Sequence, residues 1–359
     1  MIPKASIIGL GRAFKKMARG IRQSFTIDLV YDPDQEAVGW SEITGQTTVA
    51  KTEDDFFHAA AQSDVIFILS PPNEHVRQLE RAASLTKVVF VEKPLAVDLF
   101  GLQKIDRILR TNPRVYFSDF YVDIRAASLV RAFGSLLDEN GWIAPRIQTI
   151  EGKGLSDGLR NQLGQISSIE ALLLEGEGEA GVVESRPWLS KPSGGGVLLD
   201  LACHQLALYF ALFDSPLDIL DVRLGIHAAG VTGAAYQPWS AHEAVAETYA
   251  LLELRSAAGF PVRIEVGKNW EADARLFRIN ALNGTATLDF GTLKGPKNRL
   301  ITNITGAKSV FELDQNYWDM VAEGFCNYYK SGSSKPHGYR EGAAALKTIF
   351  QAKTLASNP

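Results

Sequence analysis

Short, almost continuously apolar segments alternate with segments of helical hydrophobic spacing through the first third of the chain. Apolar runs of this kind are typical of strands buried on both faces, as in a parallel sheet with helices on either side. The sequence therefore predicts an α/β fold for this part of the chain. The predicted strands span residues 5–10, 26–31, 65–69 and 87–91, and the predicted helices span 14–25, 53–62 and 76–84.

A different pattern begins near residue 120, where strand-like runs follow one another with few helices between them. Such a succession favours a largely antiparallel sheet in an α+β domain. We expect two domains, 1–120 and 121–359, with an insertion around 138–162 and a C-terminal helix that can pack back on the first domain. The predicted strands of the second domain span 165–174, 219–227, 244–254, 260–267, 276–282, 285–290 and 299–304, and its predicted helices span 124–137, 197–213, 315–330 and 339–356.

Charge and cysteine content exclude several classes of protein. Lys and Arg total 37 against 41 Asp and Glu, a net charge of −4, which argues against a nucleic acid or an anionic membrane as partner. The two cysteines, Cys203 and Cys326, make neither a disulfide framework nor a metal-ligand spacing, so we expect a reduced, cytoplasmic protein without a metal. We expect no signal peptide, because the N-terminal segment has no h-region followed by a cleavage site, and no spanning helix, because no apolar run reaches about 18 residues.

A glycine-rich turn joins the first predicted strand to the first predicted helix. In the segment Gly9-Leu10-Gly11-Arg12-Ala13-Phe14, Gly9 permits a tight turn and Gly11 lets a pyrophosphate approach the backbone. The helix N-terminus adds free N–H groups and a dipole that favours an anion. Phe14 stands where the usual fingerprint has its third glycine. With a strand before it and a helix after it, this turn predicts a dinucleotide-binding Rossmann domain over residues 1–120.

Asp32 follows the second predicted strand, about 20 residues beyond the glycine turn. This is the place of the acid that accepts hydrogen bonds from the ribose hydroxyls of the adenosine. A carboxylate there favours NAD, because it would repel the 2′-phosphate of NADP. Arg12, Lys15 and Lys16 are the counter-argument, since they could receive that phosphate. A surface turn acid before Pro33 is the alternative reading of Asp32.

Three ionisable residues stand at positions suited to chemistry. Lys93 directly follows an apolar strand, at the edge where open α/β sheets bind ligands, and Pro94 favours an extended backbone there. Asp200 and His204 are four residues apart in an apolar helix that three glycines precede, so they should share one face. A carboxylate and an imidazole are costly to bury without partners. The alternatives are a hydrogen-bonded core pair for Asp200 and His204 and a solvated strand-end lysine for Lys93.

The order of these motifs along the chain resembles that of the glucose–fructose oxidoreductase / inositol dehydrogenase / MocA (Gfo/Idh/MocA) family. The resemblance implies an N-terminal Rossmann domain and a C-terminal α/β domain with an open, mostly antiparallel sheet for substrate binding and oligomerisation. It also implies a nicotinamide cofactor, a small-molecule substrate that is most often a sugar or cyclitol, and a homo-dimer or homo-tetramer. The matching segments are Gly9-Leu10-Gly11, Ser70-Pro71-Pro72-Asn73-Glu74-His75, Glu92-Lys93-Pro94, Gly194-Gly195-Gly196-x-x-x-Asp200-x-x-x-His204 and residues 279–289.

The resemblance also assigns roles to single residues. It makes Lys93, Asp200 and His204 the catalytic set, with Lys93 also beside the cofactor. The remaining cofactor contacts implied by the glycine turn and the family motifs are Gly9, Gly11, Arg12, Ala13, Phe14, Asp32, Ser70, Pro71, Asn73, His75 and Glu92. One departure concerns the substrate, because Ala207 stands where many members have a substrate-binding acid three residues after the histidine. This argues against a polyhydroxylated substrate held as inositol is held.

Residues outside these motifs are weaker candidates. Arg186 and Trp188 precede the three glycines and could meet an anionic group and a sugar ring, and Lys153 is a further candidate for the substrate pocket. Loop packing is the alternative for Arg186 and Trp188. The glutamates at 175, 177 and 179 are predicted to form a solvated turn.

These residues together predict an NAD(P)-dependent oxidoreductase that moves a hydride between nicotinamide and a secondary alcohol or ketone of a sugar, cyclitol or related molecule, with NAD favoured and NADP possible. A redox-neutral, NAD-dependent glycosidase would use the same glycine turn and lysine. A non-catalytic nucleotide-binding regulator is the third possibility, although a regulator has no need of Lys93, Asp200 and His204 together.

Overall fold

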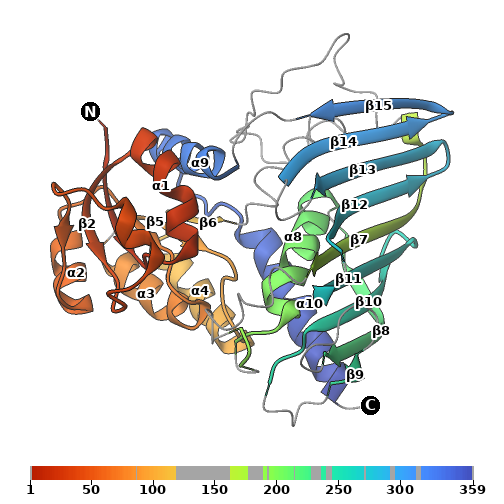
Figure 1. Ribbon diagram of the computed structural model, residues 1–359, viewed down its shortest axis with the longest axis horizontal. Helices are drawn as coiled ribbons and strands as arrows, with labels where there is room; N and C mark the ends of the chain where they lie inside the picture. The colour runs from red at the N-terminus through yellow and green to blue at the C-terminus, as the bar shows by residue number, and fades with distance from the viewer. Residues whose placement is uncertain are drawn as a thin grey trace. The chain divides into compact units, whose positions relative to one another are not determined.

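The chain folds into two compact units, one made of Met1–Ile124 with Gln315–Ala343 and the other of Arg125–Asp314 with Ala344–Pro359. Figure 1 shows the computed structural model, coloured from red at the N-terminus to blue at the C-terminus. The structure describes residues 2–85, 87–118, 162–176, 189–191, 194–213, 215–227, 236–239, 245–270, 272–291, 296–312 and 317–357.

A six-stranded parallel sheet forms the centre of the first unit (Figure 1), in the order β3-β2-β1-β4-β5-β6. All side chains of β4, β5 and β6 are buried, which confirms the parallel sheet covered on both faces. The strand order reverses between β1 and β4, where doubly wound sheets bind ligands. The strands are β1 (Lys4–Ile8), β2 (Thr26–Tyr31), β3 (Thr48–Val49), β4 (Val65–Ile68), β5 (Val88–Glu92) and β6 (Val115–Ser118), and the helices between them are α1 (Arg12–Ser24), η1 (Val38–Glu42), α2 (Glu53–Ala60), α3 (Pro72–Ser84) and α4 (Leu99–Thr111).

The sequence prediction missed α4 and β6 and began α3 four residues too late. Pro72 is the first residue of α3. This position suits proline, which has no backbone N–H, because the N–H of a first helical residue has no intrahelical partner in any case. Asp98 caps α4, with its carboxylate accepting from the Gly101 N–H at 2.6 Å. The segment Ser70–His75 is therefore a short turn followed by the first turn of a helix, and not a loop.

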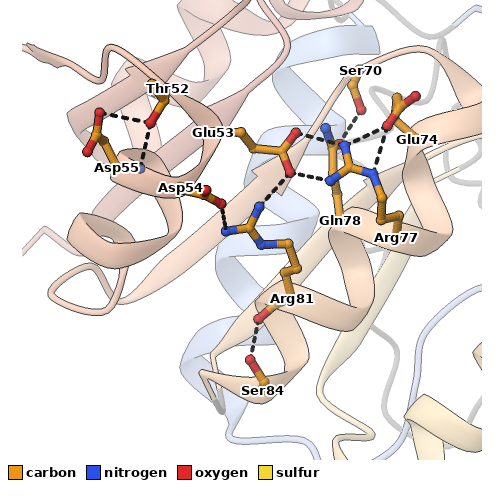
Figure 2. A network of polar contacts seen from close by, with 10 residues as sticks. All are labelled: Thr52, Glu53, Asp54, Asp55, Ser70, Glu74, Arg77, Gln78, Arg81 and Ser84. Atoms are coloured by element: carbon orange, nitrogen blue, oxygen red, sulfur yellow. Dashed lines mark hydrogen bonds and ion pairs between the residues drawn. The ribbon is translucent and has the colours of Figure 1, made fainter.

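Ion pairs tie α2 to α3 (Figure 2). Arg77 contacts Glu53 and Glu74, and Arg81 contacts Glu53 and Asp54, at distances of 2.5–2.9 Å. The hydrogen bond from Arg77 lowers the pKa of Glu53. Single exposed pairs contribute about 0–1 kcal/mol, but a network restricts several side chains at once. It thereby fixes the helix whose first turn is predicted to contact the cofactor.

Thr52 is the N-cap of α2. The Thr52 hydroxyl accepts from the Asp55 backbone N–H at 3.1 Å, and Figure 2 shows the same hydroxyl facing the Asp55 carboxylate. The threonine side chain thus supplies the first half of a capping box, and the Asp55 carboxylate accepts from its hydroxyl.

Helix α9 (Tyr317–Ser331) comes from the far end of the sequence but packs against α1 in the first unit (Figure 1). A Cβ at Gly20 would lie 2.6 Å from the Asp319 Cα, so the two backbones approach closely because α1 has a glycine there. Phe325 of α9 is fully buried within an aromatic cluster. Its ring partners, at centroid distances of 4.9–5.6 Å, are Phe25, Phe67, Phe90 and Tyr116.

A nine-stranded sheet dominates the second unit, in the order β15-β14-β13-β12-β7-β11-β10-β8-β9 (Figure 1). Its pairings are antiparallel except for β7 with β11, which confirms a mostly antiparallel second domain. The strands are β7 (Ile166–Gly176), β8 (Leu217–Ile226), β9 (Gln237–Pro238), β10 (Tyr249–Ser256), β11 (Pro261–Trp270), β12 (Ala274–Ala281), β13 (Gly284–Gly291), β14 (Pro296–Ile304) and β15 (Ala307–Glu312), and the helices are η3 (Leu198–Ala202), α8 (Cys203–Leu212) and α10 (Tyr339–Ser357), whose first five residues belong to the first unit. Within the described part of the chain, no helix combines the length and apolar character that crossing a bilayer requires.

We predict that Phe325→Ala destabilises the protein by about 3–5 kcal/mol, because it empties the centre of an aromatic cluster. Equilibrium denaturation followed by near-ultraviolet circular dichroism measures the change. Phe100→Ala, at a phenylalanine that is 58% exposed, is the matched control and should cost less than about 1 kcal/mol. Equal losses for the two variants would show that α9 is not part of the first unit's core.

Candidate active site

The turn after β1 is locked against the turn after β4. Gly9 has a φ of +94°, and a Cβ added there would lie 2.4 Å from the Ser70 backbone nitrogen. Only glycine therefore serves at this position, for its backbone conformation and for the close approach. Both turns lie at the carboxyl edge of the parallel sheet, at the point where the strand order reverses.

The N-terminus of α1 has the features of an anion site. Gly11 precedes the helix, no side chain caps it, and its first turn holds no acidic residue. A Cβ at Gly11 would meet nothing within 4 Å, so the backbone is open on that side. Arg12 and Ala13 supply the first backbone N–H groups of the helix. This arrangement fits the pyrophosphate of a dinucleotide.

Phe14, in place of the third fingerprint glycine, is fully buried. A Cβ at Gly39 of η1 would lie 2.6 Å from the Phe14 ring and 2.3 Å from the Leu10 carbonyl oxygen. The Gly39 N–H also donates to that carbonyl at 2.7 Å. Gly39 thus leaves space for the Phe14 ring and lets the η1 backbone approach Leu10 in the glycine turn.

Asp32 lies directly after β2 and faces the glycine loop. Its carboxylate accepts from the Leu10 N–H at 2.6 Å and from the Asp34 N–H at 2.8 Å. Burial raises the pKa of the Asp32 carboxyl. Each carboxylate oxygen has a second lone pair for a ribose hydroxyl. Lys16 is one of the three cations that could instead receive the 2′-phosphate of NADP. Its ammonium lies 5.1 Å from the centre of the Trp318 ring.

His75 connects two of the predicted cofactor segments. Its Nδ1 lies 2.9 Å from the Pro94 carbonyl oxygen and its Nε2 lies 2.8 Å from that of Ser70. The side chain is buried, and burial lowers its pKa. His75 therefore holds the turn after β4 next to the turn after β5. Pro71 and Asn73 of the same segment are exposed.

Lys93 follows the last residue of β5 and is partly exposed, between the buried Glu92 and Pro94. The Lys93–Pro94 peptide bond is cis. Since β1, β2, β4 and β5 are parallel, Lys93 stands at the same sheet edge as Gly9, Asp32 and Ser70.

Asp200 and His204 occupy a helix that is buried almost all round. The helix begins with π-helical turns, Leu198–Ala202, and continues as α8. The prediction of one continuous α-helix is therefore wrong at its start, where the i→i+5 pattern widens the turn that holds Asp200. Such π segments are frequent at functional sites. Asp200 and His204 are 5% and 3% exposed, so both ionisable groups are buried.

Lys268, which the sequence did not point to, and Glu175, which it placed in a solvated turn, belong to the surroundings of Asp200. The Lys268 ammonium lies 3.0 Å from the Asp200 carboxylate and 2.7 Å from that of Glu175. Glu175 is buried at the end of β7 and also pairs with Arg275 at 2.8 Å. The prediction of a solvated turn is wrong for Glu175, because two cations compensate its charge inside the sheet. A lysine at the end of an apolar strand was the available signal for Lys268.

The glycine run before this helix is packed against a buried glutamate. A Cβ at Gly196 would lie 2.2 Å from a carboxylate oxygen of Glu247. The Glu247 carboxylate accepts from the Leu198 N–H at 3.1 Å, and the Lys353 ammonium lies 3.6 Å from it. Burial raises the pKa of Glu247. Glu247 therefore supports the start of the helix that carries Asp200 and His204.

Several predicted residues lie outside the described part of the chain. They are the substrate candidates Lys153, Arg186 and Trp188, the glutamates at 177 and 179, the predicted helix at 124–137, and the insertion at 138–162 except for its last residue. Among the described residues, no group of three or more His, Cys, Asp or Glu side chains could hold a metal ion.

Comparison with known proteins identifies the first unit. Residues 4–120 match the Gfo/Idh/MocA family model, described as an oxidoreductase family with an NAD-binding Rossmann fold, which confirms the resemblance for the motifs within this range. No curated protein matches the chain.

Solved structures share the fold of the whole chain. UDP-N-acetylglucosamine 3-dehydrogenase from Acidithiobacillus ferrooxidans is 16% identical with a TM-score of 0.71, over 99% of this chain and 98% of that one. Myo-inositol 2-dehydrogenase from Lactobacillus plantarum is 17% identical with a TM-score of 0.69, over 100% and 98%. An oxidoreductase from Agrobacterium radiobacter, in complex with NAD⁺, L-tartaric acid and magnesium, is 15% identical with a TM-score of 0.72, over 100% and 97%.

We predict that Gly196→Ala destabilises the protein by about 1–3 kcal/mol more than Gly259→Ala, as measured by equilibrium denaturation. The two glycines have similar φ angles, +89° and +95°, so both variants incur the same backbone cost of about 1–2 kcal/mol. A Cβ at Gly259 meets nothing within 4 Å, whereas one at Gly196 meets a carboxylate that its hydrogen bond to Leu198 holds in place. Equal costs would show that Glu247 moves aside freely.

Proposed function

Because the chain carries the NAD-binding Rossmann domain of the Gfo/Idh/MocA oxidoreductases, we propose that it is a dehydrogenase or reductase that acts on a secondary alcohol or ketone of a sugar, cyclitol or related molecule. The observation that carries the proposal is the shared sheet edge of Gly9, Asp32 and Lys93, with the contacts Gly9–Ser70 and His75–Pro94 between their turns. The anion site at the start of α1 and Lys93, the candidate hydrogen-bond donor to the substrate, therefore belong to one framework.

The residues at this edge fit a nicotinamide dinucleotide. The uncapped N-terminus of α1 would hold the pyrophosphate, and Asp32 would accept from the adenosine ribose. Ser70, Pro71 and Asn73 would lie along the nicotinamide ribose, while His75 and Glu92 would support that segment from inside. When bound, the cofactor accepts a hydride from the alcohol carbon or returns it to a ketone.

The chain's own residues would handle the proton and the charge. We assign to His204 the removal of the hydroxyl proton during oxidation, because the ordinary pKa of imidazole lies near 6.5. Lys93 would donate a hydrogen bond to the reacting oxygen and stabilise the negative charge that develops there. Asp200 would orient His204 or Lys93 and balance the positive charge of the set.

Two of the similar structures support the substrate class, since they are named as dehydrogenases of a nucleotide sugar and of myo-inositol. Arg186, Trp188 and Lys153 remain the proposed substrate contacts. Ala207 leaves the helix without a second acid in the turn after His204, so part of the recognition of hydroxyl groups would have to come from elsewhere.

We predict that the protein binds NAD at least about tenfold more tightly than NADP, a difference of about 1.4 kcal/mol. The reason is that a 2′-phosphate would stand beside the carboxylates of Asp32 and Asp34. Titration of tryptophan fluorescence with each dinucleotide measures the ratio. Asp32→Ser should bring the ratio closer to one, and tighter binding of NADP by the unaltered protein would contradict the assignment of Asp32.

We predict that Lys93→Met and His204→Gln each lower kcat by about 10²–10⁴-fold, while NAD still binds. The assay follows the absorbance of reduced nicotinamide across a panel of sugars, sugar acids, cyclitols and amino-cyclitols. Lys51→Met and His58→Gln replace exposed residues of the same types and should leave kcat within about twofold. Activity of both catalytic variants within a few-fold of the unaltered protein would remove Lys93 and His204 from the mechanism.

A further inference from the structure

Lys268 is a buried cation for which the proposed mechanism has no role. Its side chain is 4% exposed, and its ammonium group lies between two carboxylates, at 3.0 Å from Asp200 and 2.7 Å from Glu175. A buried ammonium is costly unless it is paired and hydrogen-bonded. Its position therefore depends on those two carboxylates, and theirs on it.

The group extends by one further member, because Arg275 pairs with the other oxygen of Glu175 at 2.8 Å. Asp200 and Glu175 supply two negative charges, and Lys268 and Arg275 supply two positive charges. Glu175, Lys268 and Arg275 lie on β7, β11 and β12, and β7 is hydrogen-bonded to both of the others. The Asp200 carboxylate thus belongs to a group of four charged side chains, three of which lie on neighbouring strands in the middle of the sheet.

We propose that Lys268 is a positioning residue for Asp200: it keeps the Asp200 carboxylate ionised and fixes its orientation within the π-helical turn, one helical turn before His204. The proposal rests on the proposed function, in which Asp200 orients the proton-transfer group. Lys268 itself touches neither substrate nor cofactor in this account. It acts through Asp200, and the sheet strands rather than the helix set where the carboxylate points.

Removing the Lys268 ammonium has a physical cost. Without Lys268, the carboxylates of Asp200 and Glu175 lose a cation that both of them contact, and Arg275 is held by Glu175. The Asp200 carboxylate would then bind a proton or turn away from the sheet, since an unpaired charge is not tolerated there. In both cases its interaction with the catalytic groups changes, and a misplacement of about 1 Å can cost about 10²-fold in rate.

The test compares four variants with the unaltered protein. Lys268→Met removes the charge and keeps the length, and Lys268→Arg keeps the charge. The double variant Lys268→Met/Glu175→Gln removes one cation and one anion, so the charges of the four named side chains balance again but Asp200 still lacks the Lys268 ammonium. Arg278→Met is the matched control, because Arg278 also joins β12 to β7, through a half-exposed ion pair with Glu170 at 3.3 Å.

We expect Lys268→Met to lower kcat about 10²-fold with the NAD dissociation constant within about twofold, and Lys268→Arg to recover most of the loss. The double variant should unfold at a temperature closer to that of the unaltered protein and yet keep the low kcat. Arg278→Met should leave kcat within about twofold. An unchanged kcat in Lys268→Met, or a kcat fully restored in the double variant, would overturn the proposal.

A second measurement does not depend on turnover. Crystal structures of the unaltered protein and of Lys268→Met at one pH should show the Asp200 carboxylate displaced or rotated in the variant. An Asp200 side chain in the same place in both would overturn the proposal that Lys268 fixes its orientation, whatever the activity. Absence of activity in the unaltered protein, with Asp200 displaced in the variant, would refute the proposed function and leave the positioning role of Lys268 standing.

Discussion

The ion pair between Asp200 and Lys268 is the interaction on which the proposed chemistry depends. The helix that carries Asp200 and His204 is apolar almost all round, so it is driven into the interior of the second unit. Its carboxylate can stay ionised there only with a positive charge beside it. Lys268 supplies that charge from the sheet, and Glu175 and Arg275 hold Lys268 in turn.

The first unit meets a different constraint, which is the need to bring several backbone turns together at one sheet edge. Gly9 allows the turn after β1 to touch the turn after β4, and His75 joins that turn to Pro94. Lys93 therefore stands on the same framework as the anion site at the start of α1. The aromatic packing of the buried Phe325 of α9 and the ion pairs between α2 and α3 restrict the movement of this framework.

Much of this was accessible from the sequence, because short-range patterns determine it. The buried strands, the glycine turn and Asp32 depend on neighbours within about 20 residues, and the order of the motifs can be read along the chain without knowing the fold. Lys268 was not identified, and Glu175 was placed in a solvated turn, because their ionic partners come from distant parts of the chain. The same holds for Phe325, whose packing against the first unit no local pattern indicates.

Local patterns also failed where backbone geometry departs from the regular case. The apolar run beginning at Val197 predicts an α-helix, but its first turns are π-helical, so the four-residue spacing of Asp200 and His204 did not suffice to place them. Phe14 looked like a weakened fingerprint, yet Gly39 on a separate segment makes the space that it needs.

Hydride transfer is the central claim, and isotope labelling tests it most directly. An alcohol that the protein oxidises is prepared with deuterium on its carbinol carbon and incubated with NAD, and the reduced cofactor is examined by mass spectrometry. The account predicts that the deuterium appears in the reduced nicotinamide, in equal amount to the ketone formed. Product formation without deuterium in the cofactor, or with release of the label to water, would contradict it.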